Sequence, residues 1–135
     1  MPRQLLVPMD DSETARAALE HALEVFPNDE ITVVHAVDDL EAGYGGRPPA
    51  AVGDEGDEPE FFADVRSIAK RYDRPVETTV IEGTSADAIL EYADEANVDQ
   101  IVMGSEGRSG VSRMLLGSVA EAVTRRSPLP VTIVP

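Results

Sequence analysis

Short apolar runs alternate with amphipathic stretches along the whole chain, and this alternation restricts the possible folds more than any other feature. The apolar runs are rich in β-branched residues, and the run at 31–37 reads ITVVHAV, almost without a polar position. Such a strand is typical of a parallel sheet that helices cover on both faces. Strands are predicted at 4–9, 31–37, 76–82, 100–104 and 130–135.

The stretches between these runs place their apolar residues on one helical face. Helices are therefore predicted over 15–26, 61–72, 85–93 and 118–126. Strands and helices that alternate in this way predict an α/β fold with an open, doubly wound parallel sheet. Asp10, Asp11 and Ser12 compete as the N-cap of the first helix.

A single domain over residues 1–135 is expected from the length of the chain. Within it, the segment 38–60 contains five glycines, three prolines and eight carboxylates, a composition that cannot hold a regular element. We expect this segment to be a long acidic surface loop.

The charge of the chain is strongly negative, with 11 Lys+Arg against 26 Asp+Glu and a formal net charge of −15. Such a protein repels phosphate backbones, so no nucleic-acid partner is expected. An acid-rich, lysine-poor surface is typical of halophilic proteins, because molar salt screens charges over about 3 Å. The absence of cysteine excludes disulfides, thiol catalysis and cysteine-ligated metals.

The sequence contains neither an 18-residue apolar span nor an N-terminal signal-peptide core. It predicts a cytoplasmic protein with no membrane partner. His21 and His35 occupy core-like positions without a nucleophile at suitable spacing, so we expect both to be structural.

Residues 104–118 read GSEGRSGVSRMLLGS, directly after a predicted strand and before a predicted helix. Glycines allow the backbone to approach a ligand closely, and the start of the following helix offers free amides and the positive end of its dipole. Between 104 and 126, four arginines stand against two glutamates, a net charge of +2. A phosphate site and an ordinary loop are both compatible with this composition.

Other phosphate-binding folds fit less well. The first strand-helix turn, VPMDDSE, has no glycine, which argues against a dinucleotide-binding fold, and no glycine loop contains the Lys of a Walker A motif. An aspartyl-phosphate receiver would explain Asp10 and Asp11, but no lysine follows the fourth or fifth strand.

Gly104, Gly107, Gly117 and Ser118 follow the pattern Gly, two residues, Gly, nine residues, Gly-Ser. This pattern resembles the ATP-binding signature of the universal stress protein family. The likeness extends through VPMDDSETARAALEHALE, VVHAV, IVMGSEG and LLGSVAEAVTRRSPLPVTIVP. It implies a five-stranded parallel sheet in the order 3-2-1-4-5 with helices on both faces, as in the adenine nucleotide alpha hydrolase-like fold.

The resemblance also implies ATP as the ligand, with Mg²⁺ or Mn²⁺ as a candidate companion ion. The implied site consists of Gly107, Gly117, Ser118 and Val119 at the phosphates, Met103 and Gly104 on the ribose side, Pro8, Met9 and Asp10 beside the nucleoside, and Ala36 at the adenine. The apolar last strand, 131–134, is expected to pair with a second copy, because an uncovered apolar edge invites pairing.

Two functions follow as expectations. One is an ATP-binding stress-response protein that acts as a nucleotide-dependent regulator, with slow ATP hydrolysis at most. The alternative is a homodimeric interaction module that works without nucleotide.

Overall fold

The computed structural model describes residues 2–37, 58–105 and 116–135. The described residues form one five-stranded sheet in the order β3-β2-β1-β4-β5, and every neighbouring pair is parallel. This confirms the predicted topology. The strands are β1 (Gln4–Pro8), β2 (Glu30–Val37), β3 (Glu77–Glu82), β4 (Gln100–Gly104) and β5 (Val131–Val134).

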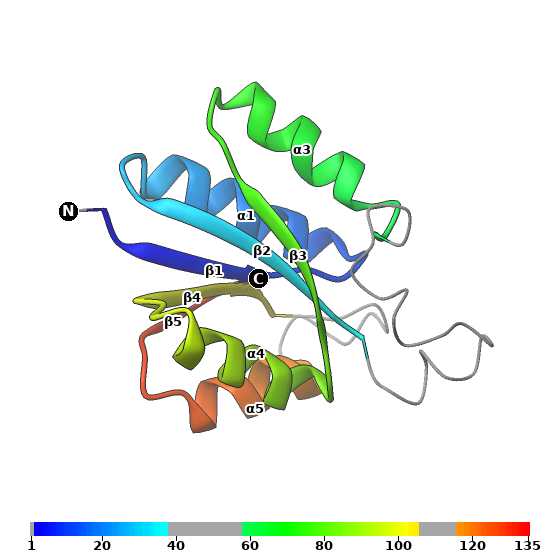
Figure 1. Cartoon of the computed structure of the whole chain (residues 1–135), viewed down its shortest axis with the longest axis vertical. Helices are drawn as coiled ribbons and strands as arrows, with labels where there is room; N and C mark the ends of the chain where they lie inside the picture. Colours follow the sequence, from blue (N-terminus) through cyan, green and yellow to red (C-terminus); the bar gives the residue numbers. More distant parts are fainter. Residues whose placement is uncertain (1, 38–57, 106–115) are drawn as a thin grey trace.

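The helices lie in two layers, one on each face of the sheet (Figure 1). One layer holds α1 (Glu13–Val25) and α3 (Phe62–Arg71), and the other holds α4 (Ser85–Glu95) and α5 (Ser118–Arg126). The predicted helices are confirmed in number and place within the described residues. Their ends differ from the predicted ones by a few residues, as is usual for boundaries read from a pattern.

Two hydrophobic cores result, because successive side chains of a strand point to opposite faces of the sheet. Leu5, Val7, Val33 and Val102 face α1 and α3. The alternate positions face α4 and α5, and they include Leu6, Val34, Ile101 and Met103. Both faces of the central strands are therefore buried, as their nearly continuous apolar sequence predicts.

Two helices end through residues with left-handed backbone, a feature that the sequence pattern did not reveal. Asp73 follows α3 with φ of 53°, and Asn97 follows α4 with φ of 55°. The next amides close the turns, with Arg74 N–H donating to Ala69 O at 3.1 Å and Val98 N–H donating to Ala93 O at 3.0 Å. These turns end α3 and α4 and lead the chain toward β3 and β4, respectively.

The amino ends of the strands are joined by side chains. The Arg3 guanidinium and its backbone N–H both donate to the carboxylate of Asp29, and Gln4 N–H donates to Asp99 Oδ2 at 2.8 Å. Arg74 donates to the carbonyls of Leu23, at 2.9 Å, and of Asp29. Each of these contacts links segments far apart in the sequence.

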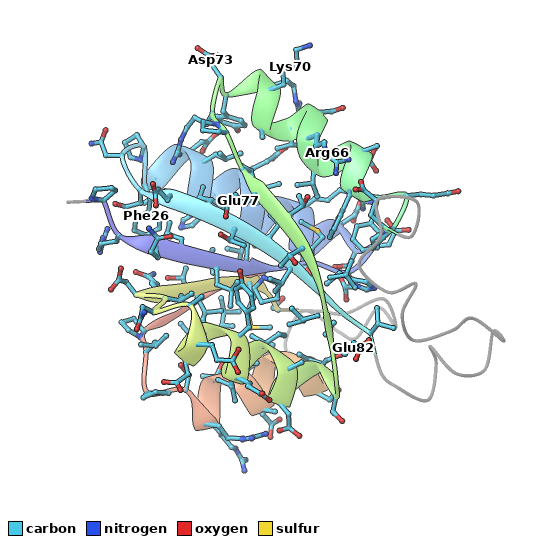
Figure 2. The ribbon with its side chains drawn as sticks, viewed as in Figure 1. Phe26, Arg66, Lys70, Asp73, Glu77 and Glu82 are labelled. Carbon is cyan, nitrogen blue, oxygen red and sulfur yellow. The ribbon has the colours of Figure 1, made fainter. Side chains whose placement is uncertain are left out.

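The two edges of the sheet differ in charge. Exposed Glu77 and Glu82 stand at the two ends of β3, and Figure 2 shows both on the outer strand. The other edge strand, β5, reads VTIV, has no charged residue and is half-buried throughout. Among the described residues, no helix is both long and apolar enough to cross a membrane.

Candidate functional site

A pocket lies at the carboxyl end of the sheet, where β1 and β4 diverge. The pairing of β1 with β4 covers only Leu5 and Leu6, whereas its pairing with β2 continues to Pro8. The pocket encloses about 130 Å³, whereas a single water needs only about 10 to 15 Å³. The order of the strands reverses at this point, which is where ligands bind in open α/β sheets.

All predicted site residues that the structure describes line this one pocket. Gly107 lies outside the described residues, so its predicted role stays a prediction. The residues brought together are Pro8, Met9, Asp10, Ala36, Met103, Gly104, Gly117, Ser118 and Val119.

The floor of the pocket belongs to the sheet face that carries α4 and α5. Leu6, Val34 and Met103 all pack into the core on that face, so the alternate positions Pro8 and Ala36 point the same way. The first turns of α4 and α5 form the opposite wall, through Ser85 and Ser118–Ala120. The space is thus apolar on the strand side and bounded by two helix N-termini on the other.

Neither of these helix starts has a side-chain cap. The N-cap residues are Thr84 for α4 and Gly117 for α5, and no side-chain hydrogen bond caps either helix. In α5 the intrahelical ladder begins with Glu121 N–H donating to Gly117 O, at 2.9 Å. The three preceding amides of the helix have no acceptor within it, and this gives the pocket donors and a partial positive charge.

One expected donor is already in use. Gly117 N–H, at the residue that precedes α5, donates to Ser105 O at 2.7 Å, so this amide is not free for a ligand. The bond instead holds the start of α5 against the end of β4. The amides that remain for a ligand are those of Ser118, Val119 and Ala120.

Gly104 has a packing role. A Cβ atom at this position would lie 2.5 Å from Thr14 Oγ1, 2.6 Å from Thr14 C and 2.8 Å from Ala15 N. The first turn of α1 therefore rests directly on the backbone of β4, and only a residue without a side chain allows this approach. The resemblance to the family implied only a ligand contact for this glycine, so its packing role is an addition from the structure.

The first turn of α1 is satisfied internally. Ser12 is its N-cap, with the side-chain oxygen accepting from Ala15 N–H at 3.2 Å, which decides among the three competing residues. Asp10 is therefore not the cap. Its carboxylate accepts from the Ser12 hydroxyl and lines the pocket.

His35 is half-buried and borders the pocket, a position that the sequence analysis did not predict. Its Nδ1 lies 2.9 Å from Met9 O, and its ring meets Phe61 edge to face with centroids 5.0 Å apart. Because a carbonyl only accepts hydrogen bonds, Nδ1 carries the hydrogen in this contact. These contacts agree with the structural role predicted for this histidine.

Several further pocket residues were missed: Ala15, Val34, Ser85, Ile89, Ser105 and Ala120. Ser105 follows Gly104 at the end of β4, and Ser85 follows Thr84 at the start of α4. A serine at the carboxyl end of a strand or at the start of a helix was the sequence signal that could have identified them. Ser105 is 4% exposed, and its hydroxyl has no hydrogen-bond partner among the described residues.

Of the four arginines between 104 and 126, the structure describes two. Arg125 and Arg126 lie at the C-terminal end of α5, away from the pocket, where they pair with Glu121 at 3.2 Å and Asp87 at 2.6 Å. Arg108 and Arg113 lie outside the described residues. Within the described part of the chain, the lining has no arginine or lysine, and the starts of α4 and α5 supply partial positive charge.

No cluster of three or more potential metal ligands occurs among the described residues. Asp10 is the only carboxylate in the described lining of the pocket.

Comparisons with known proteins agree with this architecture. The profile of the universal stress protein family matches residues 1–135. Universal stress protein MJ0531 of Methanocaldococcus jannaschii is 30% identical over 142 residues, which cover 98% of this chain and 81% of the relative.

Two solved structures share the fold. MJ0577 from the same organism is 28% identical, with a TM-score of 0.75 over 99% of this chain and 96% of its own. A universal stress protein in complex with cAMP is 27% identical, with a TM-score of 0.74 over 98% of this chain and 97% of its own.

Proposed function

Because this chain belongs to the universal stress protein family, we propose that it is a nucleotide-dependent regulatory protein that binds ATP at the carboxyl end of its sheet. The observation that carries the proposal is the single pocket that joins an apolar floor to the uncapped N-termini of α4 and α5. A relative 27% identical to this chain is described as a complex with cAMP, which supports an adenine nucleotide as the ligand.

The chemistry of the lining suits the parts of a nucleotide. Ala36 and Val34 offer a small apolar surface for the flat base, whose burial contributes to affinity. The amides that begin α5 suit phosphate oxygens, because they donate at the positive end of the helix. The Asp10 carboxylate repels phosphate but accepts hydrogen bonds from hydroxyl groups, so we assign it to the ribose.

A binding role fits the pocket better than fast catalysis. In its described lining, Asp10 and His35 are the side chains with acid-base chemistry, and both are engaged, with Ser12 and with Met9 O. Rapid phosphoryl transfer needs cationic groups around the transferring phosphate. We propose that ATP hydrolysis, where it occurs, is slow.

The uncharged edge strand β5 favours the formation of a homodimer. Among the described residues no strand pairs with the outer side of β5, and the strand has no charge to discourage pairing. We propose that a second copy covers this strand, which gives a symmetric homodimer. A homodimeric interaction module without nucleotide is the alternative that this edge alone would support.

Native mass spectrometry of gently purified protein tests both elements together. We expect the mass of a dimer and, on each subunit, the added mass of an adenine nucleotide. A dimer that never carries nucleotide, even after incubation with millimolar ATP and Mg²⁺, would leave only the interaction module.

Calorimetry with a variant that fills the pocket locates the site. Ala36→Phe places a ring on the pocket floor and should weaken ATP binding at least 10-fold, a loss of about 1.4 kcal/mol. Ala63→Phe is the matched control, because Ala63 is exposed on α3 and does not line the pocket. Titrations in molar KCl reduce repulsion by the acidic surface. Equal affinities of the two variants would place the nucleotide elsewhere.

A further inference from the structure

The hydroxyl of Ser105 is a buried side-chain group at the pocket that has no hydrogen-bond partner among the described residues. The residue is 4% exposed. A buried hydroxyl without a partner costs about 1 to 3 kcal/mol relative to one that is hydrogen-bonded. Native structures keep few such groups, so each one calls for an explanation.

The backbone of Ser105 is fixed on both sides. Its N–H donates to Val134 O at 2.9 Å, which continues the ladder between β4 and β5 by one residue. Its carbonyl accepts from Gly117 N–H at 2.7 Å, at the start of α5. The hydroxyl therefore stands on a rigid support rather than on a loose loop.

The alternation of β4 gives the direction of the side chain. Met103 faces the core under α4 and α5, and a Cβ at Gly104 would face α1 on the opposite side. Because the ladder continues through Ser105, its side chain returns to the face of Met103. That face forms the pocket floor, and both residues line the pocket.

The hydroxyl thus lines the same pocket as the free amides that begin α5. The hydrogen bond from Gly117 N–H to Ser105 O holds the two segments together. Hydroxyl groups donate strongly to charged phosphate oxygens, and the two kinds of donor together can surround one phosphate. An anionic ligand would supply the acceptor that the described protein residues do not offer.

We propose that Ser105 is a further ligand-binding residue, whose hydroxyl donates a hydrogen bond to a phosphate group of the bound nucleotide. This inference rests on the proposed function, since it takes the pocket as the nucleotide site. A phosphate oxygen of the nucleotide would then be the hydrogen-bond acceptor that the Ser105 hydroxyl lacks among the described residues.

The test is a titration of wild type and Ser105→Ala with adenosine, AMP and ATP. The variant should bind AMP and ATP about 10-fold more weakly, the usual worth of a hydrogen bond to a charged group. Its affinity for adenosine should stay within twofold of wild type. Thermal unfolding without ligand should show Ser105→Ala at least as stable as wild type, because the change removes an unsatisfied buried group.

Ser127→Ala is the matched control. Ser127 follows the last turn of α5, and its hydroxyl donates to Leu129 O at 3.0 Å and accepts from Leu129 N–H at 2.9 Å. This variant should lose stability and keep wild-type affinity for all three ligands, the reverse of the result at Ser105.

The outcomes separate the inference from the proposed function. If wild type binds none of the three ligands, the proposed function fails. If wild type binds AMP and Ser105→Ala binds it equally well, only the inference is overturned. An equal loss for adenosine and AMP also overturns it, because the hydroxyl would then meet the nucleoside.

Discussion

The two ends of the sheet are completed in different ways. At the amino end, Arg3, Gln4 and Arg74 donate to carboxylates and carbonyls of segments distant in the sequence. At the carboxyl end, two helices begin without a side-chain cap, and a buried hydroxyl has no partner among the described residues. The polar groups at the amino end form hydrogen bonds within the protein, whereas several at the carboxyl end have no partner among the described residues and could bind a ligand.

Volume alone would have pointed to the other end of the sheet. A second hollow of about 350 Å³ lies at the amino end, bordered by Asp29, Glu30 and Glu77, and it is larger than the pocket described above. Its one arginine, Arg74, already donates to two backbone carbonyls. The state of the polar groups, rather than the size of the space, distinguishes the proposed binding site from this second hollow.

The largest effect on stability is expected at Gly104, a residue at the carboxyl end whose close contact with α1 serves packing rather than binding. Gly104→Val would drive a side chain into the backbone of Thr14 and Ala15. We expect a loss of about 3 kcal/mol in the free energy of unfolding, the upper range for overpacking. Urea denaturation measures it, with Gly104→Ala as a milder step in the same direction. A wild-type midpoint for the valine variant would contradict the close approach of α1.

A smaller effect is expected at the amino end. Arg74→Ala leaves the carbonyls of Leu23 and Asp29 without their guanidinium donor, which should cost about 2 kcal/mol of stability. Nucleotide affinity should not change, because Arg74 is at the other end of the sheet from the pocket. Arg74→Lys, which keeps the charge but loses the forked geometry, should recover part of the stability. A loss of affinity at full stability would erase the contrast between the two ends.

The smallest effect concerns pH. The backbone N–H and guanidinium of Arg3 lower the pKa of Asp29, whose side chain is 11% exposed, below its ordinary value. A lowered carboxyl pKa adds stability above the unfolded value of about 3.9, and this stability is lost as the pH falls through the folded value. Between about pH 5 and pH 3, wild type should therefore lose more stability than Asp29→Asn. Parallel acid curves for the two proteins would show that this contact contributes nothing.

The fold could be predicted because its signals are local and repeated. The apolar runs of β1, β2 and β4 and the one-sided pattern of α1 each indicate their own element, and the parallel arrangement follows from their alternation. The helix ends at Asp73 and Asn97 could not be predicted, because left-handed backbone at a residue other than glycine depends on the turn that surrounds it.

The site was predicted in part, and for a different reason. The resemblance named residues from β1, β2, β4 and α5 that the structure brings to one pocket. The use of Gly117 N–H by Ser105 O, the packing role of Gly104 and the unpartnered hydroxyl of Ser105 depend on which atoms meet across the fold. Sequence spacing carries no information about such contacts.

The position of β1 has a consequence for how the protein is made. This strand is the earliest in the described chain, yet it lies at the centre of the sheet, where Leu5 pairs with Ile31 on one side and Gln100 on the other. During synthesis the second side of β1 stays unpaired until β4 has left the ribosome. Since distant pairing is slow and exposes apolar segments meanwhile, the pocket is completed late, because its lining combines residues near β1 and β2 with residues of β4 and α5.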